Sequence, residues 1–170
     1  MSESPTLAYL VVTGSVYAFR VPELIAGLSG LGLRVLTLLT PGARQVISPR
    51  ELVRVAGHRL VESYFDAALL PRPEPGLVLV APCTFNTLNK LAQGIADSLP
   101  LSLTSEAIGH GGPVLVAPSL NPGLWQHPRT ASSLVTLRGW GITIVEPEPM
   151  EHGLAPTATI LDAVRARLAG

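Results

Sequence analysis

Apolar and polar positions follow two patterns that alternate along this chain. Short apolar runs without charge are typical of strands whose two faces are both buried, as in parallel sheets. Between these runs, apolar side chains recur at the spacing of one helix face. The apolar runs predict strands at residues 9–12, 35–39, 77–81, 113–117 and 143–145. The helical spacing predicts helices around residues 21–28, 44–47, 49–56, 88–95, 101–108, 131–135 and 160–168.

This alternation of strands and helices predicts the α/β class: a doubly wound, mostly parallel sheet with helices on both faces, in a three-layer sandwich. The 170 residues are enough for a substantial core. No linker, internal repeat or low-complexity tract divides the chain. We therefore expect a single domain over residues 1–170.

A polar cluster follows the strand predicted at 77–81, which we expect to end at Pro82. Hydroxyl side chains and free backbone N–H groups would gather there, at the start of the helix predicted over 88–95. The beginning of a helix beside the carboxyl end of a strand is where open α/β sheets bind anionic ligands. An ordinary helix cap is the alternative, and it needs only one polar residue. The cluster has four: Cys83, Thr84, Asn86 and Thr87.

The composition of the chain bears on which classes of partner it could contact: other subunits, nucleic acids or membranes. Apolar residues make up 47% of the chain and charged residues 14%, with a mean hydropathy of +0.40. This is high for a monomer, so we expect other subunits to cover part of the surface. The 12 basic and 12 acidic side chains form no basic stripe, which argues against nucleic-acid binding. No apolar stretch has the length of a membrane span and no signal peptide is evident, so we expect a cytoplasmic protein without membrane contact.

Cysteine and histidine usage argues against a metal site. Cys83 is the sole cysteine, which excludes an internal disulfide framework and a cysteine-rich zinc site. The four histidines are scattered and lack the spacing of a zinc-binding helix. We therefore expect no bound metal.

The loops after the first two strands favour a monophosphate over a dinucleotide. Residues 13–18 contain one glycine, Gly14, where the dinucleotide fingerprint has three, and they lack the lysine of a phosphate-binding loop. Thr40 stands where a nicotinamide dinucleotide site has a carboxylate. Hydroxyls at Ser15, Thr40 and Thr84 suit a monophosphate, and FMN fits that description. The alternative is that these are turn residues that hold no ligand.

Two motifs resemble those of the homo-oligomeric flavin-containing cysteine decarboxylases. Residues 82–87, Pro-Cys-Thr-Phe-Asn-Thr, resemble that family's Pro-Ala-Ser-Ala-Asn-Thr, and residues 88–97 resemble its continuation Ile-Asn-Lys-Ile-Ala-Asn-Gly-Ile-Ala-Asp. Residues 118–125 resemble Pro-x-Met-Asn-x-x-Met-Trp, with leucine replacing both methionines. The family includes phosphopantothenoylcysteine decarboxylase and the enzymes that decarboxylate the C-terminal cysteine of lantibiotic-type peptides.

The resemblance implies a flavodoxin-like (Rossmann-like) fold and a homo-oligomer, either a trimer or a dodecamer, with FMN at the subunit interface. Asn121 would bind the substrate carboxylate or amide, with Leu120 beside it. Met150, in a proline-rich segment where relatives have a substrate lid, is a further substrate-binding candidate, although this segment could be a plain connection. The positions implied to contact FMN are Gly14, Ser15, Thr40, Pro82, Thr84, Phe85, Asn86 and Thr87.

The implied activity is oxidative decarboxylation of a cysteine-like thiol, with a peptide C-terminus as one candidate substrate. The family's catalytic histidine, however, has no counterpart: Ala68 stands near its position. His58 and Asp66 are the candidate replacement bases, and His58 could equally be a turn or subunit-contact residue. Two alternatives remain open: an FMN-binding regulatory or scaffold subunit without decarboxylase activity, and a related flavoprotein reaction such as prenylation of FMN.

Overall fold

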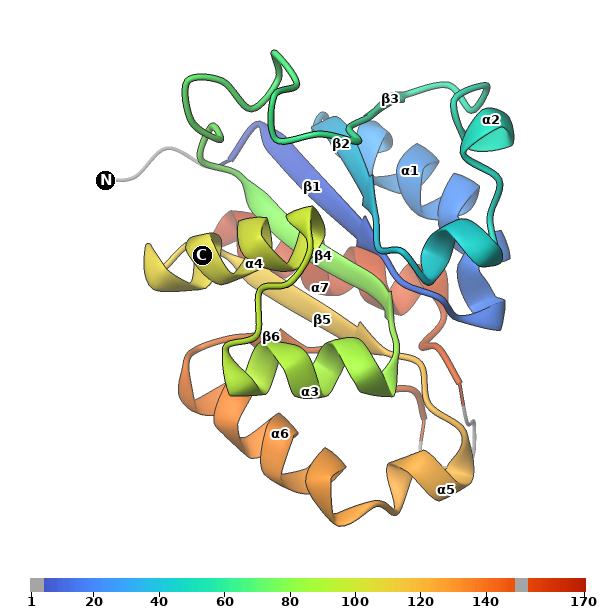
Figure 1. The fold of residues 1–170 in the computed structure, drawn as a ribbon, viewed down its shortest axis with the longest axis vertical. Coiled ribbons are helices and arrows are strands. Elements are labelled where there is room, and N and C mark those ends of the chain that lie inside the picture. The colour runs from blue at the N-terminus through green and yellow to red at the C-terminus, as the bar shows by residue number, and fades with distance from the viewer. Residues whose placement is uncertain (1–4, 149–152) are drawn as a thin grey trace.

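A computed structural model describes residues 5–148 and 153–170. Within them six strands form one sheet in the order β3-β2-β1-β4-β5-β6, and every pairing is parallel (Figure 1). Without the short edge strand β3, this is the flavodoxin-like order. The predicted doubly wound parallel sheet is confirmed. The strands are β1 (Leu7–Val12), β2 (Arg34–Leu39), β3 (His58–Leu60), β4 (Leu77–Cys83), β5 (Val114–Pro118) and β6 (Thr143–Ile144).

Helices cover both faces of the sheet. Alternate side chains of β1 point to opposite sides: Leu10 packs with helices α1 and α7, and Tyr9 packs with α3, α4 and α6. The result is three layers, with α7 behind the sheet and α4 in front of it in Figure 1. The helical elements are η1 (Val16–Arg20), α1 (Val21–Gly30), η2 (Ala43–Gln45), α2 (Pro49–Leu52), α3 (Phe85–Gln93), α4 (Leu99–Gly109), α5 (Pro122–Trp125), α6 (Pro128–Gly139) and α7 (Thr157–Ala169).

The strand predicted to end at Pro82 continues to Cys83, so that prediction is wrong. The register between β4 and β5 shifts between Val80 and Cys83, and pairing resumes between Cys83 and Pro118. Proline is tolerated at such an irregularity because no ladder hydrogen bond needs its missing N–H. Ser119 N donates to Cys83 O at 2.8 Å. The extra length of β4 brings the polar cluster directly to the edge of the sheet.

Two helix faces also differ from prediction. Ile95 lies beyond α3 and is 44% exposed, because Gly94 ends the helix in the left-handed conformation at φ +70°. On α6, Val135 is 69% exposed, and Leu134 and Leu137 are the apolar residues that face the core. The pieces predicted at 44–47 and 49–56 are shorter than expected. No helix in the described part of the chain is long and apolar enough to span a membrane.

Candidate functional site

The candidate site lies where the chain leaves β1 and β4, two neighbouring strands whose following helices cover opposite faces of the sheet. Such a switch point leaves a crevice at the carboxyl ends of the strands. Thr13, fully buried, joins its two sides. Its Oγ1 donates to Pro82 O at 2.7 Å and accepts from Thr84 N at 2.9 Å. This one hydroxyl therefore fixes the loop after β4 relative to the loop after β1.

The loops after β1 and β2 approach each other closely at Gly14. A Cβ atom at this position would lie 2.8 Å from both the carbonyl carbon and the oxygen of Gly42, which is too close for any side chain. Thr40, also in the loop after β2, is buried, and its Oγ1 accepts from Ala43 N at 3.2 Å. The glycine therefore allows the hydroxyl-bearing loop after β2 to join the edge of the site.

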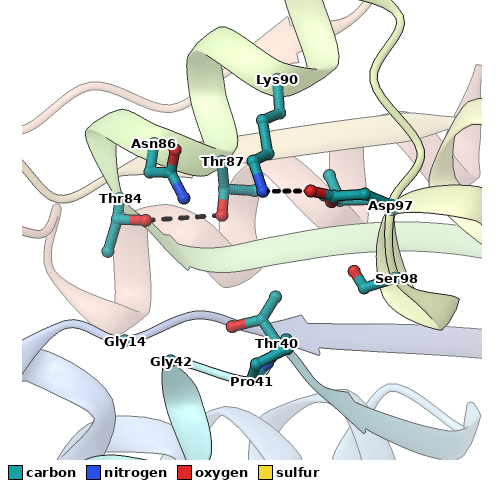
Figure 2. Close-up of a pocket in the computed structure, with 11 residues that line it drawn as sticks. Gly14, Thr40, Pro41, Gly42, Thr84, Asn86, Thr87, Lys90, Asp97 and Ser98 are labelled. Atoms are coloured by element: carbon teal, nitrogen blue, oxygen red, sulfur yellow. Dashed lines mark hydrogen bonds and ion pairs between the residues drawn. The ribbon is translucent and has the colours of Figure 1, made fainter.

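A cavity of about 360 Å³ lies between these loops and the start of α3. Figure 2 shows Thr84, Asn86 and Thr87 on one side of it and Gly14 and Thr40 on the other. Thr84 is the N-cap of α3, and its side chain makes no hydrogen bond to the helix backbone. Its Oγ1 instead donates to Thr87 Oγ1 at 3.4 Å. The N-terminus of α3 therefore faces the cavity with its positive end available to an anion.

A second helix N-terminus borders the same cavity. Ser98 is the N-cap of α4 and likewise makes no side-chain bond to its helix. Among the described residues, its Oγ is a buried oxygen with no hydrogen-bond partner. An unpaired buried hydroxyl costs free energy, so a ligand that bonds to it is favoured. Two helix N-termini and an unsatisfied hydroxyl together fit a bound phosphate.

One ion pair completes the wall of this cavity. Lys90 Nζ lies 2.6 Å from Asp97 Oδ2, and both side chains line the cavity (Figure 2). The pair is neutral as a unit, so the carboxylate does not leave a net negative wall. Because Lys90 is on α3, its ammonium group lies on the same side as the hydroxyls of Thr84 and Thr87 (Figure 2).

A larger cavity of about 650 Å³ shares Gly14, Thr84 and Asn86 with the first. Ser15 and Ser119 lie in its wall, and their Oγ atoms are 2.7 Å apart. Ser15 Oγ also accepts from the backbone N–H of Tyr17 at 3.1 Å. The loops after β1, β4 and β5 are therefore joined around two adjacent cavities that together could hold an elongated ligand.

Leu120 and Asn121 line this larger cavity. Asn121 is the N-cap of α5, where its Oδ1 accepts from Leu124 N at 3.0 Å. No described residue accepts from its Nδ2 group, which is therefore free to donate to a ligand. Leu120 is buried and forms an antiparallel bridge with Gly153, so the chain just after the undescribed residues 149–152 lies alongside. Met150 lies outside the described residues.

Phe85 forms another part of the wall of the larger cavity, and its ring packs against His127. The two rings meet edge to face, with centroids 5.1 Å apart and an interplanar angle of 76°. His127 Nδ1 accepts from Arg129 N at 3.1 Å, which fixes the imidazole at the start of α6. The contact with His127 therefore holds the Phe85 ring in place as part of the cavity wall.

The two candidate bases do not line either cavity. His58 is paired with Val35 near the amino end of β2, at the opposite end of the strands from the loops that form the site. Both of its ring nitrogens are engaged, Nδ1 with Thr37 Oγ1 at 2.8 Å and Nε2 with Leu52 O at 2.9 Å. Asp66 is paired with Arg59 at 2.5 Å.

Cys83 is fully buried, and this burial raises the pKa of its thiol well above the ordinary value. The thiol is therefore protonated near neutral pH and unsuited to nucleophilic chemistry. The described residues contain no group of three His, Cys, Asp or Glu side chains that could hold a metal ion.

Sequence reasoning missed four residues of this edge: Thr13, Lys90, Ser98 and Ser119. Thr13 and Ser119 each follow directly after a buried strand, a position that could have identified them. Lys90 lies one helical turn after Asn86, so helical spacing could have identified it, whereas Ser98 had no such signal because its place depends on how the chain turns after α3.

Comparisons with known proteins point to one family. Residues 2–169 match the Flavoprotein family. Mouse phosphopantothenoylcysteine decarboxylase is 34% identical over 145 residues, 76% of this chain and 67% of that protein. The coenzyme A biosynthesis bifunctional protein CoaBC of Thermococcus kodakarensis is 27% identical over 91% of this chain, which spans 40% of that protein's length.

Solved structures agree with this assignment. The FMN-dependent cysteine decarboxylase SpaF superposes with a TM-score of 0.77 at 27% identity, covering 98% of this chain and 99% of that one. The FMN-dependent cysteine decarboxylase TvaF, from thioviridamide biosynthesis, superposes with a TM-score of 0.77 at 25% identity, covering 97% of this chain and 99% of that one. With its two motifs placed at the carboxyl edge of a flavodoxin-like sheet, this chain belongs to the Flavoprotein family.

Proposed function

We propose that this chain binds FMN across the two cavities, with the phosphate in the smaller one. The observation that carries this proposal is the unpaired, buried Ser98 hydroxyl in a cavity that two helix N-termini border. Thr40, Thr84 and Thr87 supply further hydroxyls, and Gly14 permits close approach of a ligand to the backbone. SpaF and TvaF, at 25% identity or above, are both described as FMN-dependent.

The flavin ring would extend past the residues shared by the cavities, Gly14, Thr84 and Asn86, into the larger one. Phe85 and Ser15 would then border it, while Pro82 acts indirectly, since its carbonyl is bonded to Thr13. In this arrangement, Asn121 lies on the side of the larger cavity that is open to a substrate.

We infer that the reaction is oxidative decarboxylation of a cysteine-like thiol. When bound, FMN accepts two electrons from the substrate. The cysteine side chain, losing two electrons and two protons, becomes a thioaldehyde whose C=S group lies β to the carboxylate. That arrangement loses carbon dioxide readily and leaves an enethiol. Asn121 contributes by donating from Nδ2 to the substrate carboxylate or amide, which orients the thiol.

The base for the first step does not come from the described residues that line the cavities, since none of them is a histidine and Asp97 is paired with Lys90. We propose that the protein is a homo-oligomer, a trimer or a dodecamer, whose neighbouring copy completes the site. Val16 and Phe19, on η1 beside the larger cavity, are 79% and 71% exposed. Such exposed apolar side chains favour contact with a second copy.

The first test is the visible absorption spectrum of the purified protein, followed by mass spectrometry of any cofactor released on denaturation. Released FMN supports the proposal. A colourless protein that also fails to take up added FMN contradicts it. Cysteine-terminated peptides and acyl-cysteines then test the reaction, and the expected product is lighter by carbon dioxide and two hydrogen atoms.

A second candidate function is FMN binding without decarboxylation, in a regulatory or scaffold subunit. The observation that favours it is the engagement of His58 and Asp66 away from the cavities. Ala68→His distinguishes the two functions, because a histidine there restores the family pattern. Since Ala68 lines neither cavity and lies near His58, that histidine would act on the site of a neighbouring copy. A gain of decarboxylation in that variant, with none in the parent protein, would support the second function.

A further inference from the structure

The larger cavity is unusual in its charge. None of the described residues that line it has an ionisable acidic or basic side chain other than the Tyr17 phenol. Its polar groups are hydroxyls and amides, including Ser15 and Asn121, and much of the remaining surface is apolar, including Phe85, Leu120 and Leu124. The described part of this wall is therefore neutral and largely apolar.

One cationic side chain, Arg20, does lie behind this wall, but its hydrogen bonds are to backbone carbonyl groups. The Arg20 guanidinium sits 5.3 Å from the centroid of the Tyr17 ring. Its Nη1 donates to Ala155 O at 3.2 Å and to Leu154 O at 3.5 Å. These bonds hold the chain after Gly153 against η1. Arg20 therefore has a structural role, and rotating its side chain toward a ligand would break both of these hydrogen bonds.

A phosphorylated substrate would fit this cavity poorly. Phosphate groups are ordinarily held by Arg, Lys or a helix N-terminus, and a charge moved out of water without such a partner is strongly disfavoured. The N-terminus of α4 faces the smaller cavity, and that of α3, which borders both cavities, is assigned with it to the cofactor phosphate. The mouse relative is named for a substrate that does carry a phosphate, phosphopantothenoylcysteine.

We infer that the substrate of this chain is a cysteine derivative whose body is neutral and apolar, with the terminal carboxylate as its only charge. This inference rests on the proposed function, since it takes the larger cavity as the substrate site beside the flavin. Asn121 Nδ2 receives the carboxylate or amide, and the Phe85 and Leu124 side chains contact the apolar body. The structure thus assigns to this protein a selectivity against phosphorylated thiols.

The experiment uses a matched pair of compounds, pantothenoylcysteine and 4′-phosphopantothenoylcysteine, which differ only in the phosphate. The corresponding serine compounds, which have no thiol to oxidise, give affinities for the FMN-loaded protein from the change in flavin fluorescence. We expect the phosphorylated serine compound to bind at least about tenfold more weakly. Equal affinity, tighter binding of the phosphorylated compound, or no binding of either would overturn the inference.

A pair of variants tests the cause of the selectivity. Pro122 is exposed, lines the cavity and begins the short helix α5. Pro122→Lys places an ammonium group at the wall, and Pro122→Gln is its uncharged control. The lysine variant should narrow the difference between the two serine compounds by about threefold or more, and the glutamine variant should leave it unchanged. An equal effect of both variants contradicts the charge argument.

Turnover separates this inference from the proposed function. The cysteine compounds are followed by release of carbon dioxide. Selective binding of the unphosphorylated serine compound without any release from either cysteine compound supports the inference about the cavity and contradicts the decarboxylase. Release from both cysteine compounds with equal kcat/KM supports the decarboxylase and overturns the inference.

Discussion

Removing the Thr13 hydroxyl should weaken the protein and its cofactor site together. Thr13→Val keeps the shape of the side chain but removes a buried oxygen that bonds Pro82 O and Thr84 N, at 2.7 and 2.9 Å. Both partners lie at the end of β4, where a deleted bond leaves a polar backbone group without a substitute. Each such group costs about 1–3 kcal/mol, so for the two groups we expect a loss of about 2–6 kcal/mol in the free energy of unfolding.

The assay is urea denaturation of the protein freed of cofactor. With a denaturant slope of about 2 kcal/mol/M, the unfolding midpoint should fall by about 1–3 M. Thr136→Val is the matched control, because Thr136 Oγ1 bonds only its own helix at Ser132 O and the residue is only partly buried. That variant should change stability by less than about 0.5 kcal/mol.

Flavin affinity gives an independent measure of the same bond. Thr13 positions Thr84, the cap of the helix whose N-terminus faces the proposed phosphate cavity. Thr13→Val should therefore weaken FMN binding about tenfold or more, which corresponds to about 1.4 kcal/mol. A variant as stable as the parent protein, with unchanged FMN affinity, would refute the view that this hydroxyl ties the two loops together.

Three further predictions address separate parts of the molecule. Ser98→Ala should weaken binding of FMN more than binding of riboflavin, since the hydroxyl is assigned to the phosphate; titration of both flavins checks this, and equal effects contradict it. Gly14→Ala should abolish flavin uptake, because its Cβ would meet the Gly42 backbone at 2.8 Å, and absorbance of the purified variant shows the outcome. Burial raises the pKa of the Cys83 thiol, so this thiol should resist alkylation in the folded protein up to about pH 9; mass spectrometry checks this, and rapid labelling of the folded protein contradicts the burial. The contribution of the buried thiol to stability should be lost as the pH rises above its unfolded-state pKa of about 8.5, which denaturation at pH 7 and pH 10 checks.

The parts of the fold that the sequence predicted well are those buried on both faces. All six residues of β1 are buried, and all seven of β4, so each is a continuous apolar run that no helix pattern imitates. Strand β3 escaped notice because its three residues, His-Arg-Leu, are only partly buried and too few to show a period. Its existence depends on pairing with β2, which is a tertiary property.

The same division applies to the site. Gly14, Thr40 and Thr84 each follow a predicted strand, and parallel strands bring their carboxyl ends to one edge, so their convergence could be predicted. The position of His58 could not, because its hydrogen-bond partners Thr37 and Leu52 belong to two other elements. Histidine chemistry alone suggested a base, whereas the packed structure gives the imidazole two structural bonds.

The two cavities differ in the interactions they offer, and this difference separates cofactor recognition from substrate recognition. The smaller cavity presents helix N-termini, hydroxyls and the Lys90–Asp97 ion pair, which is neutral as a unit, and the helix N-termini and hydroxyls suit a phosphate. The larger cavity presents neutral side chains, so binding there depends on apolar contact and on the Asn121 amide. Among the described residues, Gly14, Thr84 and Asn86 border both cavities, and Ser15 and Phe85 would border the flavin ring in the larger one, so substitutions at these five positions should affect both properties. Changes at Ser98 should alter which flavin binds, and changes at Leu124 should alter which thiol binds, each without the other.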